Sequence, residues 1–158
     1  MRSLRILGLG AILSVFAFSC KPEPVFPDEP ILTFKEYIQN DVSDTLKVVF
    51  SFTDGDGDIG VSPTANDSNM VLVLYYKAPD GNFYVIDDPN TANPSDSVFY
   101  TYRIPKLASG QKGLEGDIYL TMNKAFIPYD TLQFTAFLLD QSDHKSNVVR
   151  TPEVELLR

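Results

Sequence analysis

The chain has 158 residues, of which 44% are hydrophobic and 22% are charged, so it is long enough and apolar enough to bury the core of one ordinary domain. Its 21 acidic residues outnumber its 13 basic residues, which gives a formal net charge of −8. A surface of this sign repels nucleic acid and anionic lipid, and it attracts cations. Nucleic acid is therefore not an expected partner of the folded domain.

The first predicted element is an export signal over residues 1–19. Arg2 and Arg5 precede an apolar run of thirteen residues that is followed by Ser19. This run is shorter than the roughly 20 residues that span a bilayer, and no later segment is apolar enough to replace it, so we expect a mature chain without a transmembrane helix. Removal of the signal leaves 11 basic and 21 acidic residues, a net charge of −10.

Cys20 is the only cysteine, so the domain has no internal disulfide. The sequence Ala17-Phe18-Ser19-Cys20 resembles a bacterial lipobox, in which the cysteine is lipidated and becomes the first mature residue. The alternative is ordinary cleavage after Ser19, which would leave a free amino-terminal thiol. We expect lipidation of Cys20, and by the same resemblance Lys21, in place of aspartate, indicates the outer membrane.

Residues 20–30 are predicted to form a lipid-anchored, proline-rich linker. The sequence KPEPVFPDEP carries four prolines, which prevent a helix or a central strand. Such a chain is extended at about 3 Å per residue, so ten residues would hold a domain roughly 30 Å from the membrane.

From residue 31 onward, short segments rich in β-branched and aromatic residues alternate with period two, which predicts strands and no helix. The predicted strands are Ile31–Gln39, Thr45–Thr53, Met70–Lys77, Asn82–Asp87, Ser97–Ile104, Gly116–Met122, Thr131–Leu139 and Ser146–Leu156. The sequence APDG at 78–81 predicts a tight hairpin turn. These features indicate one all-β domain over residues 31–158, an immunoglobulin-like antiparallel β-sandwich of about seven to eight strands.

Four features together resemble the small immunoglobulin-like lipoproteins of Bacteroidota. They are the lipobox-like Cys20, the proline-rich leader, VVFSFTDGDGDIG at 48–60 and FLLDQSDHKSNVVRTPE at 137–153. The resemblance covers essentially the whole chain, and DGDGDIG is its most specific part. It implies a lipoprotein that lies on the cell surface or faces the periplasm, and it specifies no activity.

The chain offers few residues for catalysis. His144 is its single histidine and is predicted to be a solvated turn residue in SDHKS. The sequence contains no G-x-S-x-G, H-E-x-x-H or phosphate-binding glycine loop. A glycosidase-like pair of carboxylates has no local sequence signature, so a small hydrolase is the weaker alternative. We therefore expect a non-enzymatic protein.

The DGDGDIG segment places Asp54, Asp56 and Asp58 on alternate residues. Glycines between them allow the backbone to curl, so that the carboxylates converge as a calcium ion requires. The segment is not an EF-hand loop, because Ile59 takes the place of the required glycine and no helices flank it. The alternative is a solvated turn in which the aspartates cap backbone amides and Ile59 closes the end of the core.

A second acidic loop is expected at the same pole of the domain. In an immunoglobulin-like order the second and seventh strands run in the same direction in opposing sheets, so the loops that follow them emerge together. The loop after the seventh strand contains Asp140 and Asp143. These two aspartates and the three of DGDGDIG are the predicted calcium ligands.

Tyrosines supply a different hypothesis, since most of them fall on predicted strands. Tyr76, Tyr84, Tyr100 and Tyr102 are either ordinary residues of a sheet face or an exposed face that stacks on sugars or on a protein partner. The expected function is a binding or structural module of the cell envelope, with an unknown protein or glycan partner. A carbohydrate-binding accessory protein of a polysaccharide-uptake system is the main alternative.

Overall fold

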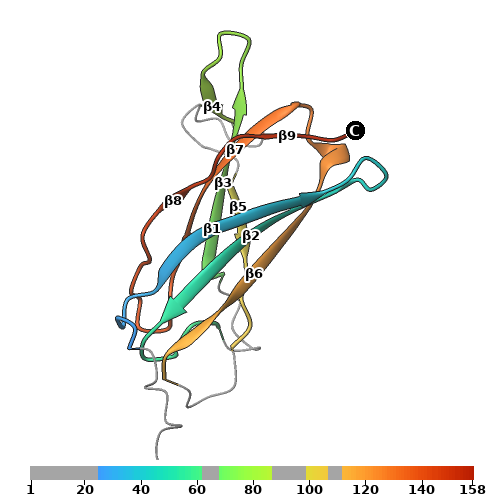
Figure 1. Cartoon of the computed structure of the whole chain (residues 1–158). Helices are drawn as coiled ribbons and strands as arrows, with labels where there is room; N and C mark the ends of the chain where they lie inside the picture. Colours follow the sequence, from blue (N-terminus) through green and yellow to red (C-terminus); the bar gives the residue numbers. More distant parts are fainter. Residues whose placement is uncertain (1–24, 62–67, 87–98, 107–111) are drawn as a thin grey trace, which may run out of the picture.

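The protein is an all-β sandwich of two antiparallel sheets in a computed structural model that describes residues 25–61, 68–86, 99–106 and 112–158 (Figure 1). The three-stranded sheet has the order β1-β2-β6. The six-stranded sheet has the order β4-β3-β7-β8, with β5 also paired to β3 and β9 paired to β7. The predicted antiparallel β-sandwich is confirmed, while Cys20 and the predicted signal lie outside the described residues.

The described part of the chain contains nine strands and one short 3₁₀ helix, joined by loops. They are β1 (Ile31–Gln39), β2 (Thr45–Asp54), β3 (Met70–Lys77), β4 (Phe83–Val85), β5 (Phe99–Tyr102), β6 (Leu114–Asn123), η2 (Lys124–Phe126), β7 (Thr131–Leu138), β8 (Val149–Arg150) and β9 (Val154–Glu155). The bounds of β1 and β3 match the prediction in full, because residues typical of turns lie on both sides of each, Pro30 and Asn40 for β1 and Asn69 and Pro79 for β3.

The last predicted strand, Ser146–Leu156, is divided into β8 and β9. Thr151 lies between the two short strands and bonds to Phe134 on β7 with both its backbone and its side chain: its N–H donates to the Phe134 carbonyl, and its Oγ1 accepts the Phe134 N–H, each at 2.9 Å. Pro152 follows without an N–H to donate, so a regular ladder cannot continue through it.

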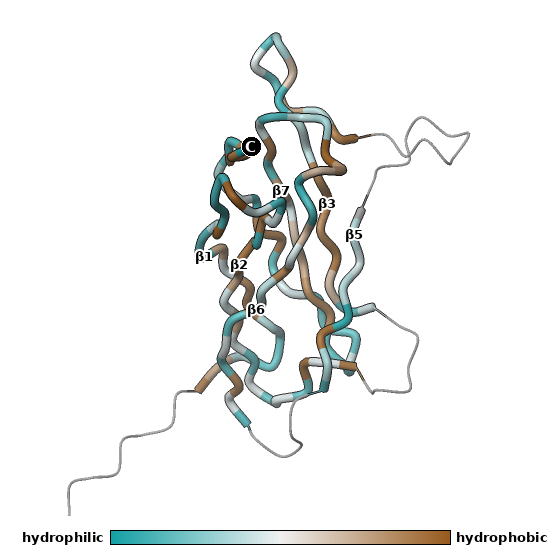
Figure 2. Tube along the Cα trace, turned by 90° about the vertical axis from the view of Figure 1, so that its right-hand side faces the viewer, coloured by the Kyte–Doolittle hydropathy of each residue, from teal (hydrophilic) through white to brown (hydrophobic). Residues whose placement is uncertain are grey.

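The core lies between the two sheets, and Figure 2 shows them as two layers. Alternate residues of β2 and β7 form much of this core: Leu46, Val48, Phe50, Phe52, Leu132, Phe134, Ala136 and Leu138 are all buried. Burial of one such large apolar side chain is worth about 1.5–3 kcal/mol. Packing of this kind stabilises a domain that has no disulfide. No helix within the described residues has the length and apolar character needed to cross a bilayer.

The two ends of the sandwich carry different turns. The predicted hairpin turn at 78–81 is present between β3 and β4, with Gly81 at a φ of 84° and its N–H donated to the Ala78 carbonyl at 2.9 Å. At the other end, the loops that follow β2 and β7 meet, and an isolated antiparallel bridge joins Ile59 to Asp140. The expected meeting of the two acidic loops is therefore found.

Candidate metal centre

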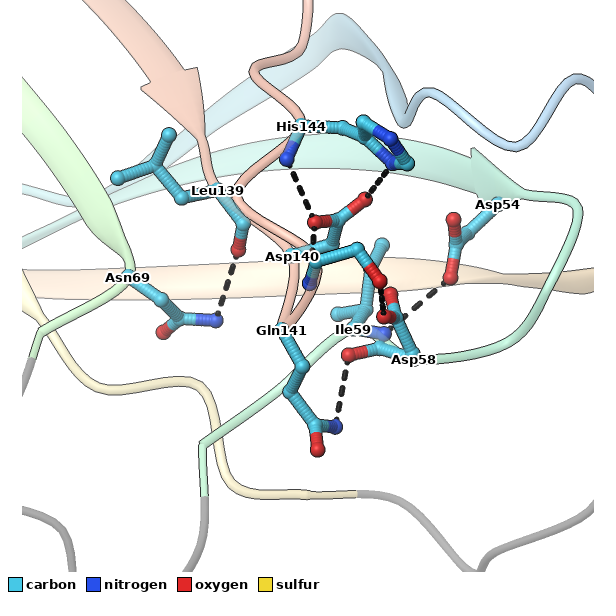
Figure 3. Close-up of polar contacts among 9 residues, drawn as sticks. Asp54, Asp58, Ile59, Asn69, Leu139, Asp140, Gln141 and His144 are labelled. Carbon is cyan, nitrogen blue, oxygen red and sulfur yellow. Dashed lines mark hydrogen bonds and ion pairs between the residues drawn. The ribbon is translucent and has the colours of Figure 1, made fainter.

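The loop after β2 is shaped by two glycines and anchored by one apolar residue. Gly57 and Gly60 have φ angles of 75° and 101°, a region that glycine occupies without strain. Ile59 is buried in the end of the core and fixes the loop to the sandwich. Figure 3 shows Asp54 at the end of β2 and Asp140 on the loop after β7, with Ile59 between them in this view.

Four of the five predicted aspartates form one group. One carboxylate oxygen from each of Asp54, Asp56, Asp58 and Asp140 lies within 4.8 Å of the others. Calcium binds oxygen at 2.3–2.6 Å, so two oxygens on one ion are at most about 5 Å apart. The four oxygens therefore lie within the span that a single calcium ion can bridge.

Asp140 is held by its own loop. Its Oδ1 accepts the backbone N–H groups of Ser142 and His144 at 2.9 Å and 2.8 Å, and its Oδ2 lies 2.9 Å from His144 Nδ1. The carboxylate is almost fully buried. These contacts fix its orientation, because each additional hydrogen bond restricts the rotation of the side chain.

Asp54 is a buried carboxylate with a hydrogen bond to only one of its two oxygens. The residue is fully buried at the end of β2, and its Oδ2 accepts the Ile59 N–H at 3.2 Å. Its Oδ1, like the Oδ1 of Asp58, is buried and has no hydrogen-bond partner in the described part of the chain. A buried carboxylate oxygen without a partner is destabilising. A positively charged ligand bound to these two atoms would therefore stabilise the fold.

The charges of the group affect its protonation. Burial, together with the nearby charges of Asp56 and Asp58, raises the pKa of Asp54 from 3.8 to about 6. Partial burial, followed by repulsion from Asp58 and Asp140, also raises the pKa of Asp56. The hydrogen bond to Asp140 raises the pKa of His144. The pole thus holds crowded negative charge, which a cation would relieve.

Two sequence interpretations of the second loop need correction. Asp143, a predicted ligand, lies outside the group of four and is exposed at the tip of the loop with a φ of 64°. The physical reason is that Asp140 caps the loop from inside, which leaves Asp143 facing solvent. His144 is not simply a solvated turn residue, since it is only partly exposed and pairs with Asp140. A histidine four residues after a buried aspartate could have suggested this contact.

The loop after β2 also holds the chain segment that leads to Cys20. The N–H of Gly55 donates to the Pro27 carbonyl at 2.8 Å, and the Gly55 carbonyl accepts the N–H of Gly113 at 2.9 Å. A Cβ at Gly55 would lie 2.4 Å from the Phe26 carbonyl oxygen, so only glycine permits this close approach. The described end of the predicted linker, residues 25–30, is therefore fixed to the acidic pole.

The four predicted tyrosines do not form one surface. Tyr76 and Tyr84 lie 6.1 Å apart between ring centroids, and Tyr76 stacks on Tyr129 at 4.2 Å, a partner that sequence reasoning missed. Tyr100 and Tyr102 lie elsewhere, on β5. They pair in register with the buried residues Leu72 and Met70 and pack against the core. Tyr76, Tyr100 and Tyr102 all pack against the core, as ordinary residues of a sheet face do, which is the first of the two alternatives.

No protein-family model, curated protein or solved structure matches the chain. The geometry of the acidic pole and the sequence that precedes the domain are therefore the basis for a functional assignment.

Proposed function

We propose that this protein is a non-enzymatic, lipid-anchored module of the cell envelope whose membrane-facing pole is stabilised by calcium. The observation that carries the proposal is Asp54, a fully buried carboxylate with an unpartnered oxygen beside three other carboxylates. The lipid anchor at Cys20 and the outer-membrane location remain proposals based on the sequence of the leader.

The ligand chemistry favours calcium over other common cations. The four side chains offer only carboxylate oxygen, which suits hard cations, whereas zinc sites commonly use sulfur or nitrogen ligands. Magnesium requires near-ideal octahedral geometry and retains several waters, so a loop that is rich in carboxylates and glycine suits calcium better.

The position of the site supports a structural role. The four aspartates come from two loops in opposing sheets, and the first loop also holds the linker through Gly55 and Pro27. An ion bound there would join both sheets and the linker at one point. Such a contact strengthens a domain without a disulfide at the end that carries the membrane anchor.

Calcium binding tests the proposal directly. Isothermal titration of the full chain carrying Cys20→Ser should show one calcium site, and its melting temperature should rise from chelator to millimolar calcium. A ligand at 100 times its dissociation constant adds about 2.7 kcal/mol to the free energy of unfolding. Unchanged melting together with no heat of binding would refute the calcium proposal.

The anchor needs its own experiment. Growth with a radiolabelled fatty acid should label the native protein and the Ser19→Ala variant, and it should not label Cys20→Ser. Ser19→Ala serves as the matched control because alanine preserves the small residue before the cysteine. Equal absence of label from all three proteins would contradict lipidation.

Carbohydrate binding is the second candidate function, and the tip near β4 favours it. Tyr84 is 46% exposed, and its hydroxyl donates to Asp80 Oδ2 at 2.8 Å, while the Asn82 amide bonds to the same carboxylate at 3.0 Å. An aromatic ring beside fixed polar groups is a suitable platform for a sugar. Binding of soluble polysaccharide that Tyr84→Ala abolishes and Tyr119→Ala preserves would support this function.

A further inference from the structure

The two long sides of the sandwich differ. On one side the Asn147 side chain bonds to both the N–H and the carbonyl of Leu32 on β1, at 2.8 Å and 2.9 Å, and Tyr37 bonds to Thr151. On the other side, the outer strands are β6 and β5 (Figures 1 and 2). All ten residues of β6 pair with β2, and β6 has no second strand partner within the described residues.

An unpaired strand edge presents a regular row of backbone donors and acceptors. In an antiparallel pair each residue directs its N–H and C=O to one edge, so about half of the β6 residues point these groups away from β2. Natural proteins often protect such an edge with a bulge or a covering segment. Along β6 the register with β2 is uninterrupted from Leu114 to Asn123, so the edge is regular enough to accept another strand.

Two hollows follow this edge and open between the sheets. The first has a volume of about 470 Å³ and lies between residues 102–105 and residues 115–120. The second has a volume of about 430 Å³ and lies between β5 and the end of β6, beside Phe126. Tyr102 lines both hollows, so they lie next to each other, and the two together are called the groove. Each is within the range of roughly 300–1,000 Å³ that is typical of ligand sites.

The groove exposes apolar side chains. Tyr102 and Ile104 are partly buried and pack against the core while also lining the groove, and Phe126 is 84% exposed at its far end. The outer face of β6 beside the groove carries Glu115 and Asp117, and Asp117 forms an ion pair with Lys35 on β1 at 2.5 Å. The site thus combines backbone groups, apolar hollows and negative charge.

We propose that this side of the sandwich binds an extended segment of a partner polypeptide, which adds to β6 as the next strand of the sheet. Successive side chains of a strand point to opposite faces. One set would enter the hollows and is expected to be apolar, while the other would lie beside Glu115 and is expected to be basic. The segment therefore alternates apolar and basic residues, a mode of recognition in which main-chain bonds give affinity and alternate pockets give specificity.

A second copy of this chain fits the groove less well. Ile118 and Leu120, the apolar residues of β6, are already buried in the core of their own sandwich. Pairing of β6 with another β6 would therefore leave the hollows unfilled. The charge of −10 on each mature chain would also oppose association. A segment of a different protein with free apolar side chains would fill the hollows, and its positive charge would favour association.

The experiment uses a defined probe, a nine-residue peptide that alternates lysine and valine. Titrated into the full chain carrying Cys20→Ser, it should bind at least tenfold more tightly than a peptide in which the same residues form one lysine block and one valine block. Backbone N-methylation of one alternating set of amides should weaken binding at least tenfold, whereas methylation of the other set should change it by less than about threefold. Only pairing along a strand edge predicts this asymmetry.

Matched variants locate the site. Glu115→Gln should weaken the alternating peptide severalfold at low salt, while Glu36→Gln, an exposed change on β1 at the closed side, should leave the affinity unchanged. Equal binding of the alternating and blocked peptides would overturn the proposal, because net charge alone would explain it. Absence of binding, or a dimer of the chain alone that Tyr119→Lys dissociates, would overturn it as well.

Discussion

Ile59 and Asp140 form an isolated antiparallel bridge that joins the loop after β2 to the loop after β7. The side chain of Ile59 is buried in the core, and the carboxylate of Asp140 is held by His144 and by two backbone amides. The positions of Asp54, next to Ile59, and of Asp140 are therefore fixed by packing and hydrogen bonds before any ion binds. A preorganised site of this kind loses little conformational entropy on binding.

Asp54→Asn should raise the free energy of unfolding in chelator and lower it in calcium. In chelator at pH 7 the substitution removes a buried charge and retains an oxygen that can accept the Ile59 N–H, so the free energy of unfolding should rise by about 1–3 kcal/mol. In saturating calcium the variant loses a ligand and should be less stable than the native protein. Urea denaturation under both conditions measures the two differences.

Asp143→Asn is the matched control for this reversal, since Asp143 lies in the same loop as Asp140 and is exposed outside the group of four. It should change the unfolding free energy by less than about 0.5 kcal/mol in both buffers. A loss of stability on Asp54→Asn in chelator would show that Asp54 is stabilised by contacts within the protein alone.

The pH dependence of stability should also change sign with calcium. The pKa of Asp54 is about 6 in the folded protein and near 3.8 when unfolded, so the native state binds more protons between these values. In chelator, the contribution of Asp54 to stability therefore falls as pH rises from about 4 to about 6, and it stays low above pH 6. In calcium, protons compete with the ion, so stability should rise over the same range.

The contribution of Asp54 is isolated by comparing the native protein with Asp54→Asn at pH 4.5 and pH 7 in each buffer. In chelator the stability advantage of the variant should be larger at pH 7 than at pH 4.5. Identical differences at the two pH values would mean that Asp54 has the same pKa in the folded and unfolded states.

Gly55→Ala should release the linker from the acidic pole without removing a carboxylate. The added Cβ would lie 2.4 Å from the Phe26 carbonyl and 2.6 Å from the Pro27 carbonyl, so the bond from Gly55 to Pro27 cannot persist in its present form. We expect a loss of roughly 1–3 kcal/mol and faster hydrogen exchange at the amide of residue 55. Gly81→Ala is the control, since a Cβ there meets no atom within 4 Å and strains only the backbone of a distant turn. An unchanged rate of hydrogen exchange at the amide of residue 55 would contradict the proposed hold of Gly55 on the linker.

Sequence patterns predicted the sheets because alternation is a local property. In β7 the buried residues recur every second position, as they do in β2 apart from Val49, and the turn residues around them mark where the strands end. The division of the last strand into β8 and β9 has one local signal, Pro152, which alternation does not register, and it depends otherwise on bonds between Thr151 and Phe134 on β7. Side-chain bonds between distant residues leave no periodic signal.

The candidate site shows the same limit. The topology argument brought Asp140 to the DGDGDIG loop, as the Ile59 bridge confirms, and it predicted the same for Asp143. The alternation of side chains along a strand could not show that Asp143 lies outside the group. The direction of a loop side chain depends on which backbone amides Asp140 caps. The groove beside β6 was also missed, since an unpaired edge becomes visible only when both sheets are placed.

Tyr37→Phe tests the closed side of the sandwich. The Tyr37 hydroxyl lies 2.5 Å from Thr151 Oγ1 and 2.8 Å from the Pro152 carbonyl oxygen, and burial raises its pKa to about 12. Removal of the hydroxyl deletes the contacts with Thr151 and Pro152, which should cost about 1–2 kcal/mol in urea denaturation. Tyr84→Phe removes an exposed hydroxyl and should cost less than about 0.5 kcal/mol. Because Tyr37 joins β1 to the opposing sheet and does not contact the groove, Tyr37→Phe should leave peptide binding at β6 unchanged, and a parallel loss of binding would show that the two sides are coupled.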